Sequence, residues 1–561
     1  MASRLSSRTP FGCAAVLLGL TVVFAVPMAA AQEAQDLQQI EAALRAGDCR
    51  AAVDIAVSMA EGDRDPRAAV RAVELARACR HPPAALRASL RLRELDPENA
   101  EALRLVGTVA LEAWQLDRAK RTFADLLAKP DVEPERALTD ILPALADGEA
   151  APAAWIVFRD LVDRGSASPR VLLELARLAC ASDDLSACRA LIRDARERGA
   201  GRDARTLRLH VAALAAQGES QAALEEAALL AQGDPENHRF VIPETLITLE
   251  RPEDARRELQ RIVETAESAG DNPTVIEADR RLAFLALGEG DLVEAERRFR
   301  RRLGGERGAA EAVYSLAVIA ERRGESAVAE AGYRQLVEAG AGLVPRTRLA
   351  RLWLARAETA QAMALFDSLL RSSRVDAIAV EVARTRVLSD EGRHEAALDA
   401  IDAALSRHPD HPDLLYQRAV LLDAADRPRE AIAVFEALLR RRPGDGHVEN
   451  ALGYTLADRG RQLPRAERLI RSALAQRPDS AAILDSLAWV RFRRGDAAAA
   501  VPLLERAWRL SREPEIAAHW GEVLWSLGER DRAREVWALG QRLSPDSRPL
   551  RRTMQRFLGT E

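Results

Sequence analysis

Residues that could bind a metal ion or act in catalysis are few in this sequence, and their spacing does not build a known reactive centre. His408 and His411 lie three residues apart, which lets two imidazoles share a metal ion, but the proline and aspartate between them are typical of a turn. Gly288-x-Gly290 lacks the third glycine and the preceding strand of a dinucleotide-binding loop. The sequence has no Cys-x-x-Cys, Gly-x-Ser-x-Gly or His-Glu-x-x-His motif. We therefore expect a protein that is not an enzyme and that uses no cofactor and no metal.

The composition points to helices. Hydrophobic residues make up 48% of the 561-residue chain but aromatic residues only 4%, so most of the apolar content is alanine and leucine. Lysine occurs only at positions 120 and 129, and arginine supplies nearly all of the positive charge. Ala, Leu, Arg and Glu favour helices, whereas the strand formers Ile, Thr and Tyr are sparse. This composition excludes a disordered, collagen-like or all-β protein, and the net charge of −5 gives no indication of nucleic-acid binding.

The N-terminus has the pattern of a secretory signal peptide. Two arginines precede an uncharged apolar run at residues 11–26, and Ala29-Ala30-Ala31 provide small residues for cleavage. We expect a cleaved signal and an exported, periplasmic protein, with an uncleaved anchor as the alternative. Cys13 lies at the start of the apolar run and no lipid-accepting cysteine follows it, so the sequence leaves membrane association open. No other stretch is apolar and long enough to span a bilayer, so we expect no transmembrane segment in the mature chain.

A period of about 34 residues runs through the rest of the chain. Each copy has a small marker residue, and a bulky apolar residue often follows four positions later, as at Phe435 and Trp537. A proline often follows twelve positions after the marker, as at Pro443 and Pro478, and a second small residue such as Gly521 lies about twelve positions before it. The markers are Ala52, Ala85, Ala119, Ala154, Cys188, Ala223, Ala255, Ala295, Ala329, Ala362, Ala397, Ala431, Ala466, Ala500 and Ala533.

This pattern predicts a helix–turn–helix unit. Small residues at facing positions let two antiparallel helices approach closely, and the bulky residue fills the space beside them. Glycines such as Gly324 and Gly528 fall where the first helix must end. One pair of helices cannot bury its apolar face alone, so we expect an all-α fold, an α-solenoid superhelix of about fifteen stacked pairs. The unit resembles the tetratricopeptide repeat.

One irregular step divides the array. The markers Ala255 and Ala295 are 40 residues apart, and Ser268–Pro273 predicts a longer connection between them, where we expect the array to bend. The predicted segments are a signal peptide at 1–31, a degenerate N-terminal repeat array at 32–270, a C-terminal repeat array at 271–545 and a capping helix at 546–561.

Four cysteines lie beyond the predicted signal. Cys180 falls late on a first helix and Cys188 early on the second helix of the same repeat, so the two can face each other across one turn. Cys49 and Cys79 fall near corresponding ends of adjacent repeats. Because an oxidising compartment permits disulfides, we predict two local bridges, 180–188 and 49–79. Four small buried cysteines are the alternative.

Three C-terminal segments resemble one proteobacterial tetratricopeptide family: Asn450–Arg459 (NALGYTLADR), Ala482–Trp489 (AILDSLAW) and Pro514–Trp525 (PEIAAHWGEVLW). That family includes an outer-membrane lipoprotein that is the adaptor of a periplasmic carboxyl-terminal processing protease. The resemblance implies that this chain binds such a protease and presents cell-wall hydrolases to it. The chain departs from the lipoprotein in lacking its lipid-bearing cysteine.

A binding surface is predicted on the first helices of the last four repeats. In such repeats the first helices line a concave surface, and positions −3, +1 and +4 from the small first-helix residue share one face. Ten of the 23 aromatic residues lie after residue 411, and five of those are on this face. Aromatic and polar side chains together suit an extended or helical peptide, although packing between neighbouring helices is the alternative. The predicted binding residues are Tyr416, Asn450, Tyr454, Asp485, Trp489, Phe492, Glu522 and Trp525.

Three other tryptophans, Trp508, Trp520 and Trp537, fit core positions of the repeat. The sequence thus predicts a non-enzymatic scaffold or adaptor that binds proteins or peptides in the bacterial cell envelope and binds no nucleic acid. A structural or assembly factor for an envelope secretion or polysaccharide complex is the alternative.

Overall fold

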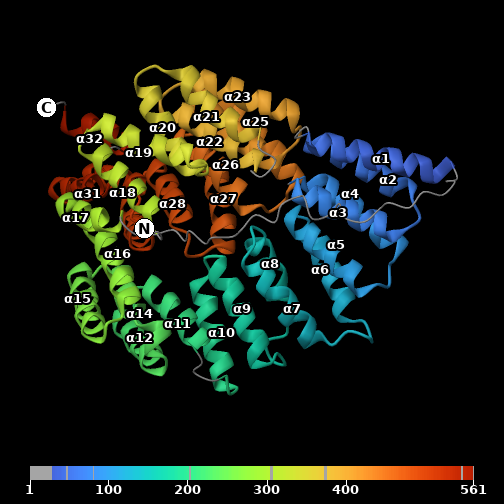
Figure 1. The fold of residues 1–561 in the computed structure, drawn as a ribbon, viewed down its shortest axis with the longest axis horizontal. Helices are drawn as coiled ribbons and strands as arrows, with labels where there is room; N and C mark the ends of the chain where they lie inside the picture. Colours follow the sequence, from blue (N-terminus) through green and yellow to red (C-terminus); the bar gives the residue numbers. More distant parts are fainter. Residues whose placement is uncertain are drawn as a thin grey trace. The chain divides into compact units, whose positions relative to one another are not determined.

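The structure is a computed structural model that describes residues 28–45, 48–79, 81–200, 204–303, 308–371, 376–544 and 547–559. Residues 1–27, which hold most of the predicted signal peptide, lie outside the described residues. Every regular element in the described part is a helix, and no strand occurs there. The helices follow one another along the chain as antiparallel neighbours (Figure 1).

The helices form two compact units, and each unit combines two separate stretches of the chain. The first unit holds the described residues up to Ala137 together with Glu330–Pro443. Its helices are α1 (Met28–Arg45), α2 (Cys49–Gly62), α3 (Pro66–Ala78), α4 (Pro82–Leu95), α5 (Ala100–Glu112), α6 (Leu116–Leu127), α20 (Leu343–Ala355), α21 (Thr359–Leu370), α22 (Ala377–Asp390), α23 (His394–Arg407), α24 (Pro412–Ala424) and α25 (Pro428–Arg441).

The second unit holds Leu138–Ala329 and the described residues from Gly444 onward. The boundaries between the units fall inside α7 (Pro134–Ala146) and α19 (Ser326–Glu338). The remaining helices are α8 (Ala151–Leu161), α9 (Pro169–Ala181), α10 (Leu185–Glu197), α11 (Ala204–Ala216), α12 (Ser220–Gly233), α13 (Pro235–His238), α14 (Val241–Thr248), α15 (Pro252–Ala269), α16 (Asn272–Glu289), α17 (Leu292–Arg302), α18 (Ala309–Arg322), α26 (Gly446–Asp458), α27 (Leu463–Gln476), α28 (Ala481–Arg493), α29 (Ala497–Leu510), α30 (Pro514–Ser526), α31 (Arg530–Leu543) and α32 (Arg548–Leu558).

The predicted all-α array of helix–turn–helix repeats is confirmed, and the marker residues show why it forms. All fifteen markers have 0% exposure, so each lies in the interface between packed helices. The bulky residue four positions later is buried as well, as at Phe123, Phe299 and Trp537. Because the marker is buried in every copy, the helix–helix contact that it makes recurs from repeat to repeat.

Close approach of two helices explains the small residue that precedes each marker. A Cβ atom on Gly521 would lie 2.0 Å from Nε1 of Trp537, and a Cβ on Gly453 would lie 2.5 Å from Cγ1 of Ile470. Each glycine therefore lies directly against the bulky residue of its own repeat. In these repeats the bulky side chain of the second helix occupies the space that a larger first-helix residue would need.

The turns inside the repeats also follow the prediction. Gly324 and Gly528 have φ angles of 75° and 85°, in the left-handed region that favours glycine. The expectation of a longer connection at Ser268–Pro273 is wrong: α15 and α16 each have 18 residues, and only Gly270 and Asp271 separate them. The extra residues of the 40-residue step extend both helices, because Gly270 at φ 69° ends one helix and Asp271 caps the next at once.

Candidate protein-binding face

The predicted binding residues of the second unit lie on three consecutive first helices, α26, α28 and α30. The helix α28 contacts both α26 and α30. We call the side chains on this side of the three helices the first-helix face; it comprises Asn450, Tyr454, Asp458, Asp485, Trp489, Phe492, His519, Glu522 and Trp525. Tyr416 belongs to α24 in the other compact unit, where its ring packs edge-on against Phe435 with centroids 5.6 Å apart.

A histidine–aspartate pair occupies the centre of the first-helix face. Nδ1 of His519 on α30 lies 2.9 Å from Oδ2 and 3.0 Å from Oδ1 of Asp485 on α28. The His519 ring stacks on the indole of Trp489, with centroids 4.3 Å apart, and the hydroxyl of Tyr454 lies 3.5 Å from its Nε2. The imidazole therefore connects polar groups from all three helices.

The electrostatic environment of His519 favours its protonated form. Burial lowers the pKa of His519, but the charge and hydrogen bond of Asp485 raise it, with smaller contributions from Glu522 and Asp458. The net effect is a pKa above the ordinary value of histidine. The pair therefore behaves as a partly buried ion pair, with 15% of the His519 side chain and 10% of the Asp485 side chain exposed.

Trp489 contributes mainly to the interior of the face. Its exposure is only 6%, and its Nε1 donates a hydrogen bond of 3.2 Å to Oδ1 of Asp458. Its ring also contacts Phe492 at a centroid distance of 5.4 Å, and the Arg493 guanidinium lies 5.8 Å from its centroid. Most of the surface of Trp489 is thus used in contacts within the protein, which supports the packing interpretation for this residue.

The far end of the face meets the C-terminal helix. Glu522 forms an ion pair with Arg556 of α32. The rings of Trp525, Trp537 and Phe557 form a cluster in which each contacts the other two, at centroid distances of 5.6 to 5.8 Å. Trp525 therefore helps to attach α32, and only its remaining surface is open to a partner.

The surface left for a partner comes from half-buried side chains. Tyr454, Phe492, Glu522 and Trp525 are half-buried, whereas Asp485 and Trp489 are buried. The polar groups on these half-buried side chains are the Tyr454 hydroxyl and the Glu522 carboxylate, whereas Oδ1 of Asn450, which has no hydrogen-bond partner among the described groups, is itself buried. The face thus offers aromatic edges next to polar atoms, the combination that binds peptide side chains and peptide backbone.

His519 is the functional candidate that the sequence pattern missed. It lies two positions before the small residue Gly521, outside the −3, +1 and +4 positions used for the prediction. It reaches Asp485 only because α30 packs on α28, 34 residues away in the sequence. A search for polar residues at position −2 of one repeat and −3 of the preceding repeat would have found it.

The other tryptophans pack against neighbouring helices. Trp508 is 3% exposed and Trp537 fully buried, while Trp520 is half-buried and lies 6.3 Å from Trp508 between ring centroids. A hollow of about 320 Å³ adjoins Trp508 and Trp520. It is lined by residues of α29, α30 and α31: Glu505, Trp508, Arg509, Trp520, Arg532, Glu535, Val536 and Leu539.

The described residues contain no group of three or more His, Cys, Asp or Glu side chains placed to hold a metal ion. His408 directly follows α23 and His411 directly precedes α24, so both lie in the connection between two repeats. Among the helices that the structure describes, none combines the length and the apolar character needed to cross a membrane.

The four predicted disulfide cysteines lie in two pairs. The sulfur atoms of Cys180 and Cys188 are 2.12 Å apart, with a sequence separation of 8. Those of Cys49 and Cys79 are 2.22 Å apart, with a separation of 30. Both distances are bonding distances, and each bridge stays within neighbouring helices.

Comparison with known proteins identifies the repeat. Residues 388–453 and 450–513 match family models described as tetratricopeptide repeat. A TPR repeat-containing protein of Pseudomonas aeruginosa is 29% identical over 249 residues, which cover 44% of this chain and 42% of the relative. The chain thus spans less than half the length of that relative.

Two solved structures are similar at low sequence identity. A thermophilic TPR protein of Thermus thermophilus has 23% identity and a TM-score of 0.30, covering 32% of this chain and 99% of its own. A tetratricopeptide repeat protein of Parabacteroides merdae has 16% identity and a TM-score of 0.30, covering 50% of this chain and 97% of its own. From the buried markers and the family matches, we conclude that residues 388–513 of this chain carry tetratricopeptide repeats.

Proposed function

We propose that this protein is a non-enzymatic adaptor of the bacterial cell envelope that binds a partner on the first-helix face. Tetratricopeptide repeats indicate a protein–protein interaction scaffold. We further propose that one partner is a periplasmic carboxyl-terminal processing protease and that this protein presents cell-wall hydrolases to it. Holding enzyme and substrate on one scaffold raises their effective concentration without any new chemistry.

The observation that carries the proposal is the composition of the first-helix face. Its half-buried aromatic side chains are Tyr454, Phe492 and Trp525. The Tyr454 hydroxyl lies 3.5 Å from Nε2 of His519, which forms an ion pair with Asp485. Aromatic side chains of this kind are frequent anchors of protein interfaces, since they bury a large area at little conformational cost. A peptide with apolar side chains and an accessible backbone matches this surface better than a small polar metabolite does.

The envelope location rests on the N-terminal sequence and on the cysteines. The apolar run with an Ala-Ala-Ala end is typical of a cleaved signal peptide. Two cysteine pairs at bonding distance suit an oxidising compartment. The resemblance of the C-terminal segments to the lipoprotein adaptor family supports the choice of partner.

The experiment is affinity purification from the envelope fraction with the full-length protein, F492A and the matched control W520A. Phe492 and Trp520 are both half-buried aromatic residues near the C-terminus, but Trp520 lies outside the first-helix face. We expect the wild type and W520A to recover a serine protease together with a cell-wall hydrolase, and F492A to recover at least about tenfold less, the loss typical of a removed hot spot.

Other outcomes would contradict the proposal in different ways. Recovery of secretion or polysaccharide components alone would favour an assembly factor and exclude the protease adaptor. Equal recovery by F492A and the wild type would exclude this face as the binding surface. Circular dichroism of each variant shows whether a loss of binding reflects a loss of folding.

A further inference from the structure

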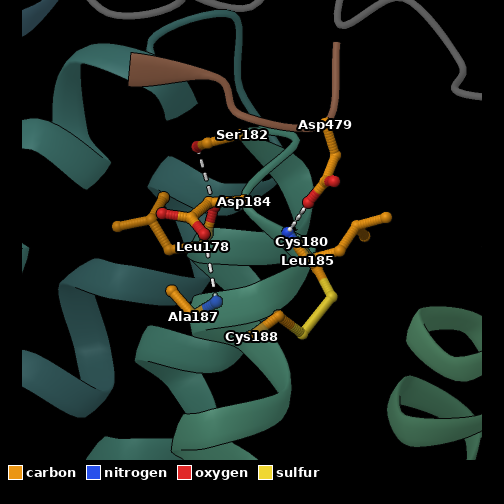
Figure 2. The surroundings of a disulfide bond; sticks show 8 residues. All are labelled: Leu178, Cys180, Ser182, Asp184, Leu185, Ala187, Cys188 and Asp479. Atoms are coloured by element: carbon orange, nitrogen blue, oxygen red, sulfur yellow. Dashed lines mark hydrogen bonds between the residues drawn. A yellow bond between two sulfur atoms is a disulfide. The ribbon is translucent and has the colours of Figure 1, made fainter. Parts of the chain in front are cut away.

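Two turns that are far apart in the sequence meet within the second compact unit. One joins α9 to α10, and the other joins α27 to α28 (Figure 2). The backbone N–H of Asp479 donates to the carbonyl of Asp183 at 2.9 Å, and Oδ2 of Asp479 accepts from the backbone N–H of Leu185 at 2.9 Å. Nε of Arg477 donates to Oδ2 of Asp183 at 3.1 Å. We call this set of contacts the turn clasp.

Asp479 gives a second cap to the helix α10. The first backbone N–H groups of a helix lack partners inside it, and they attract a carboxylate. Asp184 caps α10 locally, accepting from the N–H of Ala187 at 3.0 Å, while Asp479 takes the N–H of Leu185. The other oxygen of Asp479 accepts from Arg506 at 2.5 Å.

Both oxygens of the Asp479 carboxylate are therefore used in hydrogen bonds, one to α10 and one to Arg506. Its residue is only 8% exposed, and both oxygens have charged or helix-terminal donors. A buried carboxylate that loses such donors destabilises the folded protein. Movement of the α9–α10 turn would therefore destabilise the α27–α28 turn, which contains Asp479. By contrast, the pair Glu250–Arg512, which also joins the two stretches, is half exposed and contributes little.

The α9–α10 turn contains one residue in the left-handed region, as the corresponding turns of other repeats do. Asp183 has φ 54°, and Asp426 and Gly324 at the same position of other repeats have φ 60° and 75°. The carbonyl of Asp183 is the acceptor for Asp479. The hydroxyl of Ser182 donates to the carbonyl of Leu178 at 2.8 Å and fixes one side of the turn (Figure 2).

The bridge between Cys180 and Cys188 spans this same turn. The two cysteines flank the seven residues that include Asp183 and Leu185, and the bond joins the end of α9 to the start of α10 (Figure 2). A cross-link over a short loop removes conformations that the open loop would sample. The bridge thus restricts the loop to shapes near the one that contacts Asp479.

We propose that the Cys180–Cys188 bond is a redox control of the turn clasp: the bonded form holds the clasp closed, and the dithiol form releases it. A dithiol reductant supplies two electrons and two protons. The S–S bond breaks, both cysteines become thiols, and the reductant becomes a disulfide. The freed turn then leaves the left-handed conformation at Asp183 more often, and Asp479 loses the acceptor and donor that it meets there.

The consequence reaches the first-helix face. Asp479 lies two residues before α28, the helix that carries Asp485 and Trp489. Opening of the clasp breaks the hydrogen bonds of Asp479 to Asp183 and Leu185, which hold the segment just before that helix. The clasp proposal does not depend on the identity of the partner that the face binds.

The test is hydrogen exchange of the full chain, read on peptides that cover Leu185 and residues 477–484. The variants are C180S/C188S, D479N and the matched control C49S/C79S, which removes the other bridge in the other unit. We expect C180S/C188S and D479N to speed exchange of both peptides about tenfold, as the loss of a hydrogen bond to a charged group implies. We expect C49S/C79S to leave both peptides unchanged.

A second measurement covers the case in which C180S/C188S fails to fold. In C49S/C79S the only cysteine pair beyond the predicted signal is Cys180 with Cys188, so titration with a dithiol reports on that bond alone, and alkylation followed by mass spectrometry counts the thiols. We expect exchange at residues 477–484 to rise in step with the appearance of two thiols. Exchange that does not change while the thiols appear would overturn the proposal, as would native wild-type protein with free thiols at these positions.

Discussion

The imidazole of His519 lies against the carboxylate of Asp485, with Nδ1 and Oδ2 2.9 Å apart, although the two residues belong to different repeats. The pair links α30 to α28, and its stacking on Trp489 places it within the aromatic part of the first-helix face. Its protonation therefore affects both the packing of adjacent repeats and the charge of the proposed binding surface.

The stability of the C-terminal repeats should depend on the protonation of His519. Because its pKa is raised in the folded state, the folded protein binds the proton more tightly than the unfolded chain does. The stabilisation is complete below the unfolded pKa, about 6.5, and is lost as the pH rises through the folded pKa. Urea unfolding of wild type and H519Q between pH 5 and pH 9 should show a larger difference at pH 5.

The control for that measurement is D485N, which removes the carboxylate. We therefore compare D485N with the double variant D485N/H519Q. The difference between their free energies of unfolding should not fall as the pH rises. A wild-type advantage over H519Q that grows as the pH rises would contradict the assignment, because it would mean that neutral histidine is the stabilising form.

His408 should produce the opposite dependence in the other unit. Burial and, to a smaller extent, the charges of His411, Arg407 and His81 lower the pKa of His408 to about 4, and the charge of Asp48 opposes this shift. The unfolded chain takes up a proton near pH 6.5 while the folded protein stays neutral, so stability falls as the pH drops from about 6.5 to about 4.

Thermal unfolding of H408Q across that range should show a weaker loss at acid pH than the wild type. Parallel profiles for wild type and H408Q would show that other groups cause the acid sensitivity.

Two glycine-to-alanine substitutions should change the free energy of unfolding in opposite directions. In G521A the new Cβ would lie 2.0 Å from Nε1 of Trp537, so the helices must separate, and we expect a loss of about 1–3 kcal/mol. In G288A nothing lies within 4 Å of the new Cβ, and alanine favours the helix by about 0.5–1 kcal/mol. Chemical denaturation of both variants checks the signs, and equal effects would contradict the close approach of α30 and α31.

The two disulfides should differ in their contribution to stability. Chain entropy predicts a larger effect for the longer loop: about 3.6 kcal/mol for the separation of 30 at Cys49–Cys79, and about 2.5 kcal/mol for the separation of 8 at Cys180–Cys188. Urea unfolding of the two double-serine variants measures both values. Native mass spectrometry that finds four free thiols in the wild type would contradict both bridges.

Sequence spacing was sufficient for contacts inside one repeat. Gly521 and Trp537 are 16 residues apart and meet because a short turn brings two helices back antiparallel. The buried markers follow from the same local geometry. The misplaced connection at Ser268–Pro273 shows the limit of spacing, since a step of 40 residues does not reveal whether extra residues extend a loop or a helix.

The binding face was predicted only in part for a related reason. Its aromatic residues repeat with the period and were found, but the burial of Trp489 depends on His519 and Asp458, which come from the two neighbouring repeats. Tyr416 fits the same pattern and yet belongs to the other compact unit.

The sequence by itself determined the repeating helix pair, because the residues in that contact are close along the chain and meet at a fixed spacing. Only the tertiary structure decided that His519 pairs with Asp485. It also decided that the carboxylate of Asp479 caps α10 by accepting a hydrogen bond from the N–H of Leu185, 294 residues away in the sequence. The first contact depends on how two adjacent repeats pack against each other, and the second joins turns of two distant repeats. Neither contact can be predicted from the residues of one repeat.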